Sequence, residues 1–217
     1  MDLAPAAASA PRRTQAERRA ASRARMLDAA LDLVAERRSL RFTLAEVGER
    51  AGYSRGLPGQ AFETKTGLIE ALAHHALVLA DADFPHTERG EGLTAVLATV
   101  RLLMLGGGGH ERVHQAVQVM LAEAAAPGSP HRAAMAELNR VSTGYLSKQL
   151  RLAAERGEIA ADIDFRSQAA LILGAVRGAL LHSQIEPDRF DRAALHRELE
   201  RSLLAALRPA DGRSTGR

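Results

Sequence analysis

The chain has 217 residues and a formal net charge of +3; 46% of the residues are apolar, only 3% are aromatic and none is cysteine. The lack of cysteine excludes disulfides and thiolate metal sites and fits a reducing compartment such as the cytoplasm, and no apolar run of about 18 residues is present to span a membrane. Because the apolar residues are mainly Ala, Leu and Val, they are numerous enough for a sizeable core and favour helices over sheets.

The positive charge is concentrated in the N-terminal part. Residues 1–65 contain 12 basic and 8 acidic residues, a net charge of +4, whereas the remainder carries a net charge of −1. Residues 1–15 form a basic arm rich in Ala, Pro and Ser, which we expect to be disordered and which lacks the pattern of a signal peptide. Six arginines in and after this arm form either a solvated helix face or a footprint on DNA phosphates. They are Arg12, Arg13, Arg18, Arg19, Arg23 and Arg25.

Four helices are predicted up to about residue 83. The first, over about 16–38, has one apolar stripe formed by Leu27, Ala30, Leu31 and Val34. Thr43 and Glu46 form a capping box for the second, which ends at Gly52. Ser54 is expected to cap a third that ends at Phe62.

Lys65 or Thr66 opens the fourth helix, over about 66–83, which connects to the rest of the chain. Two helices of about eight residues are not stable alone, so they must pack on the first and the fourth. Short helices joined by a turn at Gly52 are typical of a helix-turn-helix DNA-binding domain, which we assign to residues 16–65.

Five longer helices are predicted for residues 84–208, which we assign to a second domain. They cover about 92–105, 111–125, 130–156, 164–185 and 189–207. Residues 106–109 are all glycine, so we expect a flexible joint there, and residues 209–217 form a polar tail that we expect to be disordered. The predicted fold class is therefore all-α, with about nine helices.

Two runs in the N-terminal part resemble a known family. MLDAALDLVAERR and FTLAEVGERAGYSRGLPGQAFETKTGLIEAL, within about residues 25–75, are similar to the DNA-binding domain of TetR/AcrR-type transcriptional regulators. The remainder resembles the family only in the order and lengths of its helices. The resemblance implies a homodimer, more commonly a repressor, that binds a palindromic operator on double-stranded DNA and releases it when an unknown small molecule enters the second domain. We accordingly expect no enzymatic activity, no cofactor and no membrane partner.

The resemblance also implies which residues contact DNA. Some match positions that face phosphates and others match positions that face base edges. The phosphate-facing set is Thr43, Tyr53, Ser54 and Lys65, and the base-facing set is Arg55, Leu57 and Gln60. The chemistry agrees, because Arg forms paired hydrogen bonds with guanine, Gln does so with adenine, and Leu can contact a thymine methyl group.

The recognition segment departs from the family at Pro58-Gly59, where an aromatic residue commonly follows the leucine. If Ser54 is the cap, Pro58 is the fourth helical residue and removes the first intrahelical donor. Alternatively the helix begins later, with Pro58 in its first turn.

His110-Glu111-Arg112-Val113-His114 matches the H-E-x-x-H pattern, in which two histidines on one helix face bind zinc and the glutamate acts as general base. The match lies at a helix start, and the longer form of the motif fails because Val117 and Met120 occupy its glycine and histidine positions. A coincidental surface helix is therefore the favoured interpretation. The alternatives are a zinc-dependent hydrolase and a role for His114 in an effector pocket or at an ion.

An effector pocket is expected among the helices from about 92 to 185. The candidate lining residues are Met104, His114, Met120, Tyr145 and Arg177, and plain core positions are the alternative for the methionines and the tyrosine. The spacing of Gly174 and Gly178 permits close helix approach. Together with Leu195 and Leu199 of the last helix they predict a dimer interface, a four-helix bundle with two helices from each chain; packing within one chain is the alternative.

Overall fold

The computed structural model describes residues 14–82, 90–106 and 109–209, and all regular structure within these ranges is α-helical. The nine helices of this part of the chain are α1 (Gln15–Arg37), α2 (Leu44–Arg50), α3 (Leu57–Phe62), α4 (Lys65–Ala82), α5 (Leu93–Leu105), α6 (Gly109–Ala125), α7 (Arg132–Glu155), α8 (Phe165–Ile185) and α9 (Arg192–Leu207). The predicted all-α class is confirmed. No helix in the described ranges combines the length and the apolar character needed to cross a membrane.

Side-chain caps set several helix starts. The predicted capping box of α2 is present: the Thr43 hydroxyl accepts from the Glu46 amide at 3.2 Å, and a Glu46 carboxylate oxygen accepts from the Thr43 amide at 2.7 Å. Thr14 and Glu17 form a second box at α1, which sequence reasoning missed. Asp164 caps α8 by accepting from the backbone amides of the first turn. Each cap satisfies amides that have no partner within the helix.

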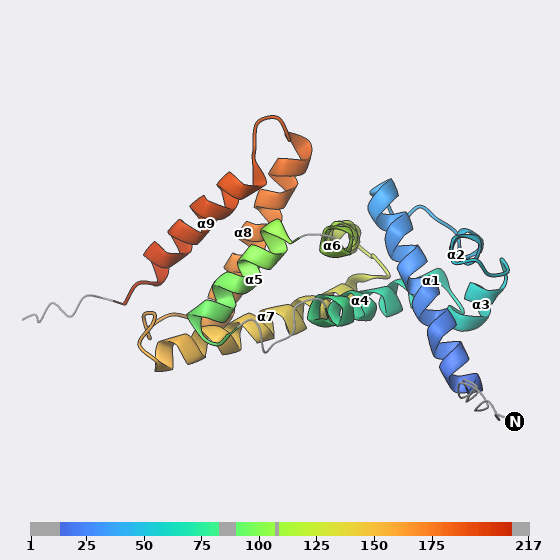
Figure 1. The fold of residues 1–217 in the computed structure, drawn as a ribbon, viewed down its shortest axis with the longest axis horizontal. Coiled ribbons are helices and arrows are strands. Elements are labelled where there is room, and N and C mark those ends of the chain that lie inside the picture. Colours follow the sequence, from blue (N-terminus) through green and yellow to red (C-terminus); the bar gives the residue numbers. More distant parts are fainter. Residues whose placement is uncertain (1–13, 83–89, 107–108, 210–217) are drawn as a thin grey trace, which may run out of the picture.

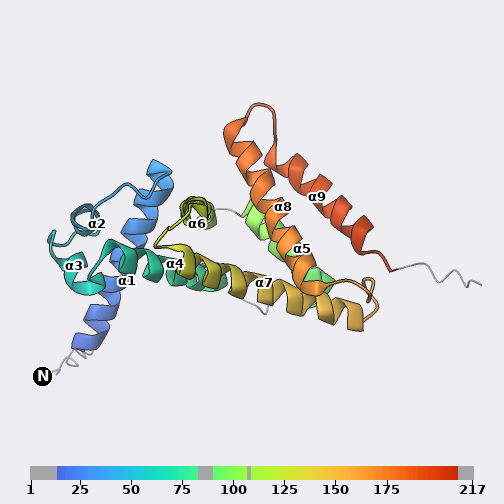
Figure 2. The same cartoon turned by 180° about the vertical axis from the view of Figure 1, so that it is seen from behind.

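The helices form two units, one with α1, α2 and α3 and the other with α5, α8 and α9. Helices α4, α6 and α7 connect the two units. In both views α2 and α3 lie at one end of the molecule, beside α1, whereas α9 lies at the other end (Figure 1 and Figure 2). Helix α6 packs against α1, α4 and α7, and α8 packs against α7, α5 and α9.

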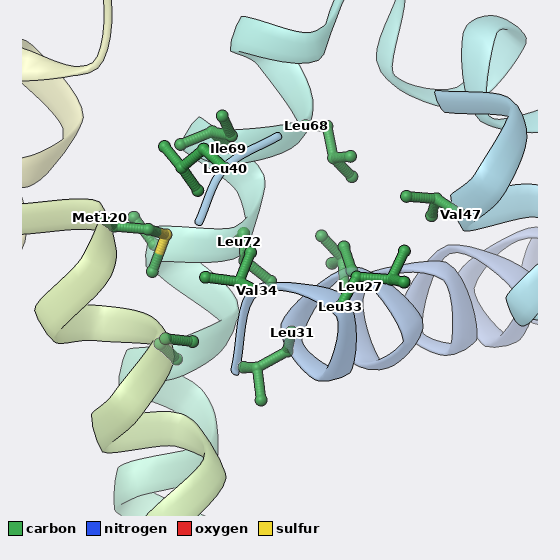
Figure 3. Packing of buried hydrophobic residues seen from close by; sticks show 14 of the residues in the cluster. Leu27, Leu31, Leu33, Val34, Leu40, Val47, Leu68, Ile69, Leu72 and Met120 are labelled. Carbon is green, nitrogen blue, oxygen red and sulfur yellow. The ribbon is translucent and has the colours of Figure 1, made fainter. Parts of the chain in front are cut away.

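There are two hydrophobic cores in the described part of the chain. One joins α1, α2 and α4 to α6 and the start of α7; Met120 of α6 lies in it with Leu72 of α4 and Val34 of α1 (Figure 3). The other lies among α5, α7, α8 and α9. The predicted domain division at residue 84 remains a prediction, and the first core extends across it because α6 folds back onto α1.

Candidate nucleic-acid interface and ligand cavity

A tight turn joins α2 to α3. The Gly52 amide donates to the Glu49 carbonyl at 3.1 Å, and the Tyr53 amide donates to the Gly48 carbonyl at 2.8 Å. Gly52 has a φ of +76°, a left-handed conformation that glycine adopts without steric cost. The predicted stop at Gly52 is therefore correct, and it turns the chain so that α3 packs against α2.

Helices α2 and α3 approach each other closely at Gly48. A Cβ atom added at Gly48 would lie 2.6 Å from the Ser54 carbonyl oxygen and 3.1 Å from Cδ of Pro58. Pro58 is buried and is the second residue of α3, where a backbone amide has no partner within the helix. Helix α3 therefore begins later than a Ser54 cap predicts: its N-cap position is Gly56, and the expectation for Ser54 as the cap is wrong because the chain from Ser54 to Gly56 forms the turn.

The side chains expected to contact DNA lie at this end of the molecule. Four of them are exposed: Thr43, Ser54, Arg55 and Gln60. Tyr53 and Leu57 are half-buried against the first core. The Arg55 guanidinium pairs with the Glu49 carboxylate at 3.1 Å, with both side chains more than half exposed, so the pair is open to exchange with another partner.

Lys65 is directed at its own chain in this structure. Its amine donates to the Leu40 carbonyl and lies 4.7 Å from the centre of the Phe42 ring, and burial lowers its pKa. A phosphate contact by Lys65 stays a prediction and requires the amine to leave this carbonyl.

The six arginines near the N-terminus fall into three groups. Arg18, Arg19 and Arg25 are exposed on α1, whereas Arg12 and Arg13 lie outside the described residues. Arg23 instead donates to the Ala61 carbonyl at 2.6 Å and lies 4.3 Å over the Phe62 ring. It therefore holds the end of α3 against α1, a structural role that sequence spacing did not indicate.

The α2 cap predicts an acid-sensitive step in stability. Hydrogen bonds from Arg37, and then from Thr43, lower the pKa of Glu46 from 4.5 to about 2. A carboxylate with a lowered pKa stabilises the fold fully above the unfolded pKa and loses this contribution as the pH falls toward the folded value. In urea titrations we expect Glu46→Gln to cost a constant free energy of unfolding above about pH 4.5, and the difference from wild type to shrink between pH 4.5 and about 2. A difference that stays constant through this window would contradict the assignment.

A cavity of about 410 Å³ lies between the two units, lined by residues of α4, α5, α6, α7 and α8. Of the predicted residues, it is lined by His114, Tyr145 and Arg177. The structure does not bring Met104 and Met120 to it. Both are fully buried, Met104 in the second core and Met120 in the first.

The polar groups of the cavity differ in how they are engaged. The hydroxyls of Thr99 and Ser142 donate to carbonyls of their own helices, at 2.8 and 2.9 Å. The Arg177 guanidinium donates to Asn139 Oδ1 at 2.8 Å. Gln118, which sequence reasoning missed, lines the cavity one helical turn beyond His114; that spacing of four was the available signal.

Gln118 also begins a hydrogen-bonded chain that leaves the cavity. Its Oε1 accepts from Gln184 Nε2 at 3.0 Å, and Gln184 Oε1 accepts from a guanidinium nitrogen of Arg38 at 2.8 Å. Arg38 is the C-cap residue of α1. Helix α6 is tied to α1 a second time by the ion pair of Arg112 with Asp32, at 2.6 Å. The cavity wall is therefore bonded directly to the helix that supports α2 and α3.

The H-E-x-x-H match is only partly described, because the His110 side chain lies outside the described residues. Glu111, which would be the general base of a zinc hydrolase, pairs with Arg192 at 2.9 Å. Among the described residues no group of three or more His, Asp or Glu side chains is placed to hold a metal ion.

One face of α8 is apolar and exposed. Leu171, Leu181 and Ile185 are 67%, 53% and 67% exposed. With the helical period of 3.6 they share a face with Gly174 and Gly178, and a Cβ added at either glycine would meet nothing within 4 Å. The glycines are therefore not needed for packing within the described chain. Leu195 and Leu199 of α9 are half-buried against the core of the same chain.

No protein-family model matches the sequence, and no curated protein matches it. Solved structures do match. A protein from Rhodococcus sp. assigned to the TetR family of transcriptional regulators is 19% identical, with 87% of this chain and 99% of that one covered and a TM-score of 0.77. A TetR-family regulator from Agrobacterium tumefaciens is 15% identical, with 88% and 99% covered and a TM-score of 0.71. The complex of SmeT with triclosan is 22% identical, with 88% and 93% covered and a TM-score of 0.69.

Proposed function

We propose that this chain, which has the fold of TetR-family transcriptional regulators, is a homodimeric DNA-binding regulator that leaves its operator when a small molecule fills the cavity. The observation that carries the proposal is the exposed recognition segment: α3 is held on α2 by the Gly48–Pro58 contact while Arg55 and Gln60 remain exposed. These are side chains that read guanine and adenine in the major groove. The net charge of +4 on residues 1–65 supplies attraction to phosphates.

The exposed face of α8 supports a dimer. Apolar side chains at Leu171, Leu181 and Ile185 flank two glycines, so a second copy of α8 can approach closely. In a dimer with two-fold symmetry both copies use the same face, so this face of α8 can pair with itself. Two recognition helices related in this way would read half-sites about 34–36 Å apart on a palindromic operator.

The cavity supports control by a ligand. Helix α6 lines it with His114 and Gln118, and the same helix packs on α1 and forms the Arg112–Asp32 ion pair. A ligand that favours one position of α6 shifts the DNA-binding form by its difference in affinity for the two positions. Triclosan is the compound in the SmeT complex; by analogy we infer a small molecule with a largely apolar body here.

Selection of bound DNA from a random pool tests the proposal. We expect one palindromic sequence, bound with an affinity that falls steeply as salt rises, because released counterions drive the binding. Failure to enrich any sequence, or an affinity that does not depend on salt, would contradict a DNA-binding function.

Replacing Arg55 by alanine is expected to weaken binding to the selected operator by about 1–3 kcal/mol per contact and to relax its preference at one base pair of each half-site. The matched control is Arg201→Ala on α9, where an arginine of similar exposure pairs with Glu198 far from α3. Fluorescence anisotropy with the operator and with single-base variants measures both effects. Equal losses for the two variants would show that Arg55 does not read a base.

A further inference from the structure

The described lining of the cavity combines apolar walls with one half-buried guanidinium. Most of its lining is aliphatic, including Leu102, Val117, Val141 and Leu173, and the described lining contains no Asp or Glu. Arg177 of α8 is among the lining residues. A volume of about 410 Å³ lies within the range of roughly 300–1,000 Å³ that is usual for small-molecule sites.

Arg177 has a neutral partner where a charged one is expected. Within the described residues its guanidinium bonds only to the Asn139 amide oxygen, and it makes no ion pair. Burial lowers its pKa, which reflects the unfavourable desolvation of the charge. A guanidinium has five N–H donors in a fork that fits a carboxylate, so most of its donors are not used by Asn139.

A second donor of the cavity is also unused. Gln118 Nε2 is buried and has no hydrogen-bond partner among the described residues, because the Gln184 bond engages only the oxygen of this amide. A buried donor without a partner costs about 1–3 kcal/mol. The unused N–H groups of Arg177 and Gln118 both need a hydrogen-bond acceptor. Because Arg177 is a cation, it favours an acceptor with negative charge.

We propose that the cavity takes a small organic acid, with an anionic oxygen group on Arg177 and an apolar body against the aliphatic walls. The inference rests on the proposed function in so far as this acid is the effector. Such a ligand supplies the charge that Arg177 lacks and leaves its own apolar part away from water. A cationic ligand is excluded from the same place by repulsion from Arg177.

Three probes that share one chain and differ in head group test the proposal: decanoate, decanol and decylammonium, titrated calorimetrically into the full-length protein. We expect decanoate to bind at least about tenfold more tightly than decanol, since hydrogen bonds to charged groups are the stronger ones, and decylammonium not to bind. Arg177→Met should bring decanoate to the affinity of decanol, and Arg177→Lys should keep the preference for the acid. Arg166→Met, the same change at an exposed position of α8, should leave the order unchanged.

Equal affinities of decanoate and decanol for the wild-type protein would overturn the proposal, and so would absence of decanoate binding or an Arg177→Met variant that keeps the preference. The wild-type comparison decides even if Arg177→Met does not fold. Operator binding by the same preparations separates this inference from the proposed function. A protein that binds its operator but shows no preference for the acid refutes only the ligand class, whereas a protein that binds acids but no DNA refutes the regulator.

Discussion

Replacing Gly178 by glutamate is expected to convert the proposed dimer into monomers and to weaken operator binding by about 10²–10⁴-fold, because the two half-sites would no longer be bound by linked recognition helices. Gly178 lies in the middle of the exposed apolar face of α8, between Leu171 and Ile185. A charge placed there would be buried without a partner in a symmetric interface, and it would occur twice.

We do not expect this change to lower the free energy of unfolding of the single chain. A Cβ at Gly178 meets nothing within 4 Å, and glutamate favours a helix over glycine by less than about 1 kcal/mol. The matched control is Gly144→Glu on α7, likewise helical and open around the added Cβ, but away from the apolar face of α8. Sedimentation and circular dichroism check both variants. A Gly178→Glu protein that remains dimeric would place the interface elsewhere.

The helix boundaries that sequence predicted well are those set by local chemistry. Thr43 with Glu46, and Gly52, act on amides or backbone angles within a few residues, so their effect can be predicted without the fold. The sequence left two possible starts for α3 because two local rules conflicted. Ser54 is a good cap, but a proline such as Pro58 belongs in the first turn of a helix. The structure decides between them through a contact with Gly48, ten residues earlier, which packs against the proline ring.

The cavity was predicted only in part for a similar reason. His114, Tyr145 and Arg177 each carry a polar group, and all three line it. Met104 and Met120 lie on apolar faces that serve a core equally well, and periodicity alone does not say which apolar face meets a cavity. That α6 would fold back onto α1 depends on contacts between residues about 80 apart, such as Arg112 with Asp32. Nothing local to either helix encodes that pairing.

Replacing Gly48 by alanine should loosen the recognition helix and abolish specific operator binding. The added Cβ would lie 2.6 Å from the Ser54 carbonyl oxygen, which is a backbone atom and cannot move without moving the turn. Overpacking of this kind costs about 1–3 kcal/mol, and α3, with six residues, has little stability of its own. We expect a lower unfolding midpoint in urea and loss of selectivity for the operator over unrelated DNA.

The matched control is Gly59→Ala, which adds the same methyl group within α3 itself, where a Cβ meets nothing within 4 Å. Its stability should be unchanged or raised by up to about 1 kcal/mol through helix propensity. If steric contact with the turn is the cause, only the Gly48 variant unfolds earlier. Equal unfolding midpoints for the two variants would mean that α2 and α3 can separate at no cost, and the Gly48–Pro58 contact would then not be what holds the recognition helix in place. Because Pro58 is the position at which the recognition segment departs from the family it resembles, the same comparison tests whether this chain holds α3 by its own means: a glycine on α2 that receives a proline ring.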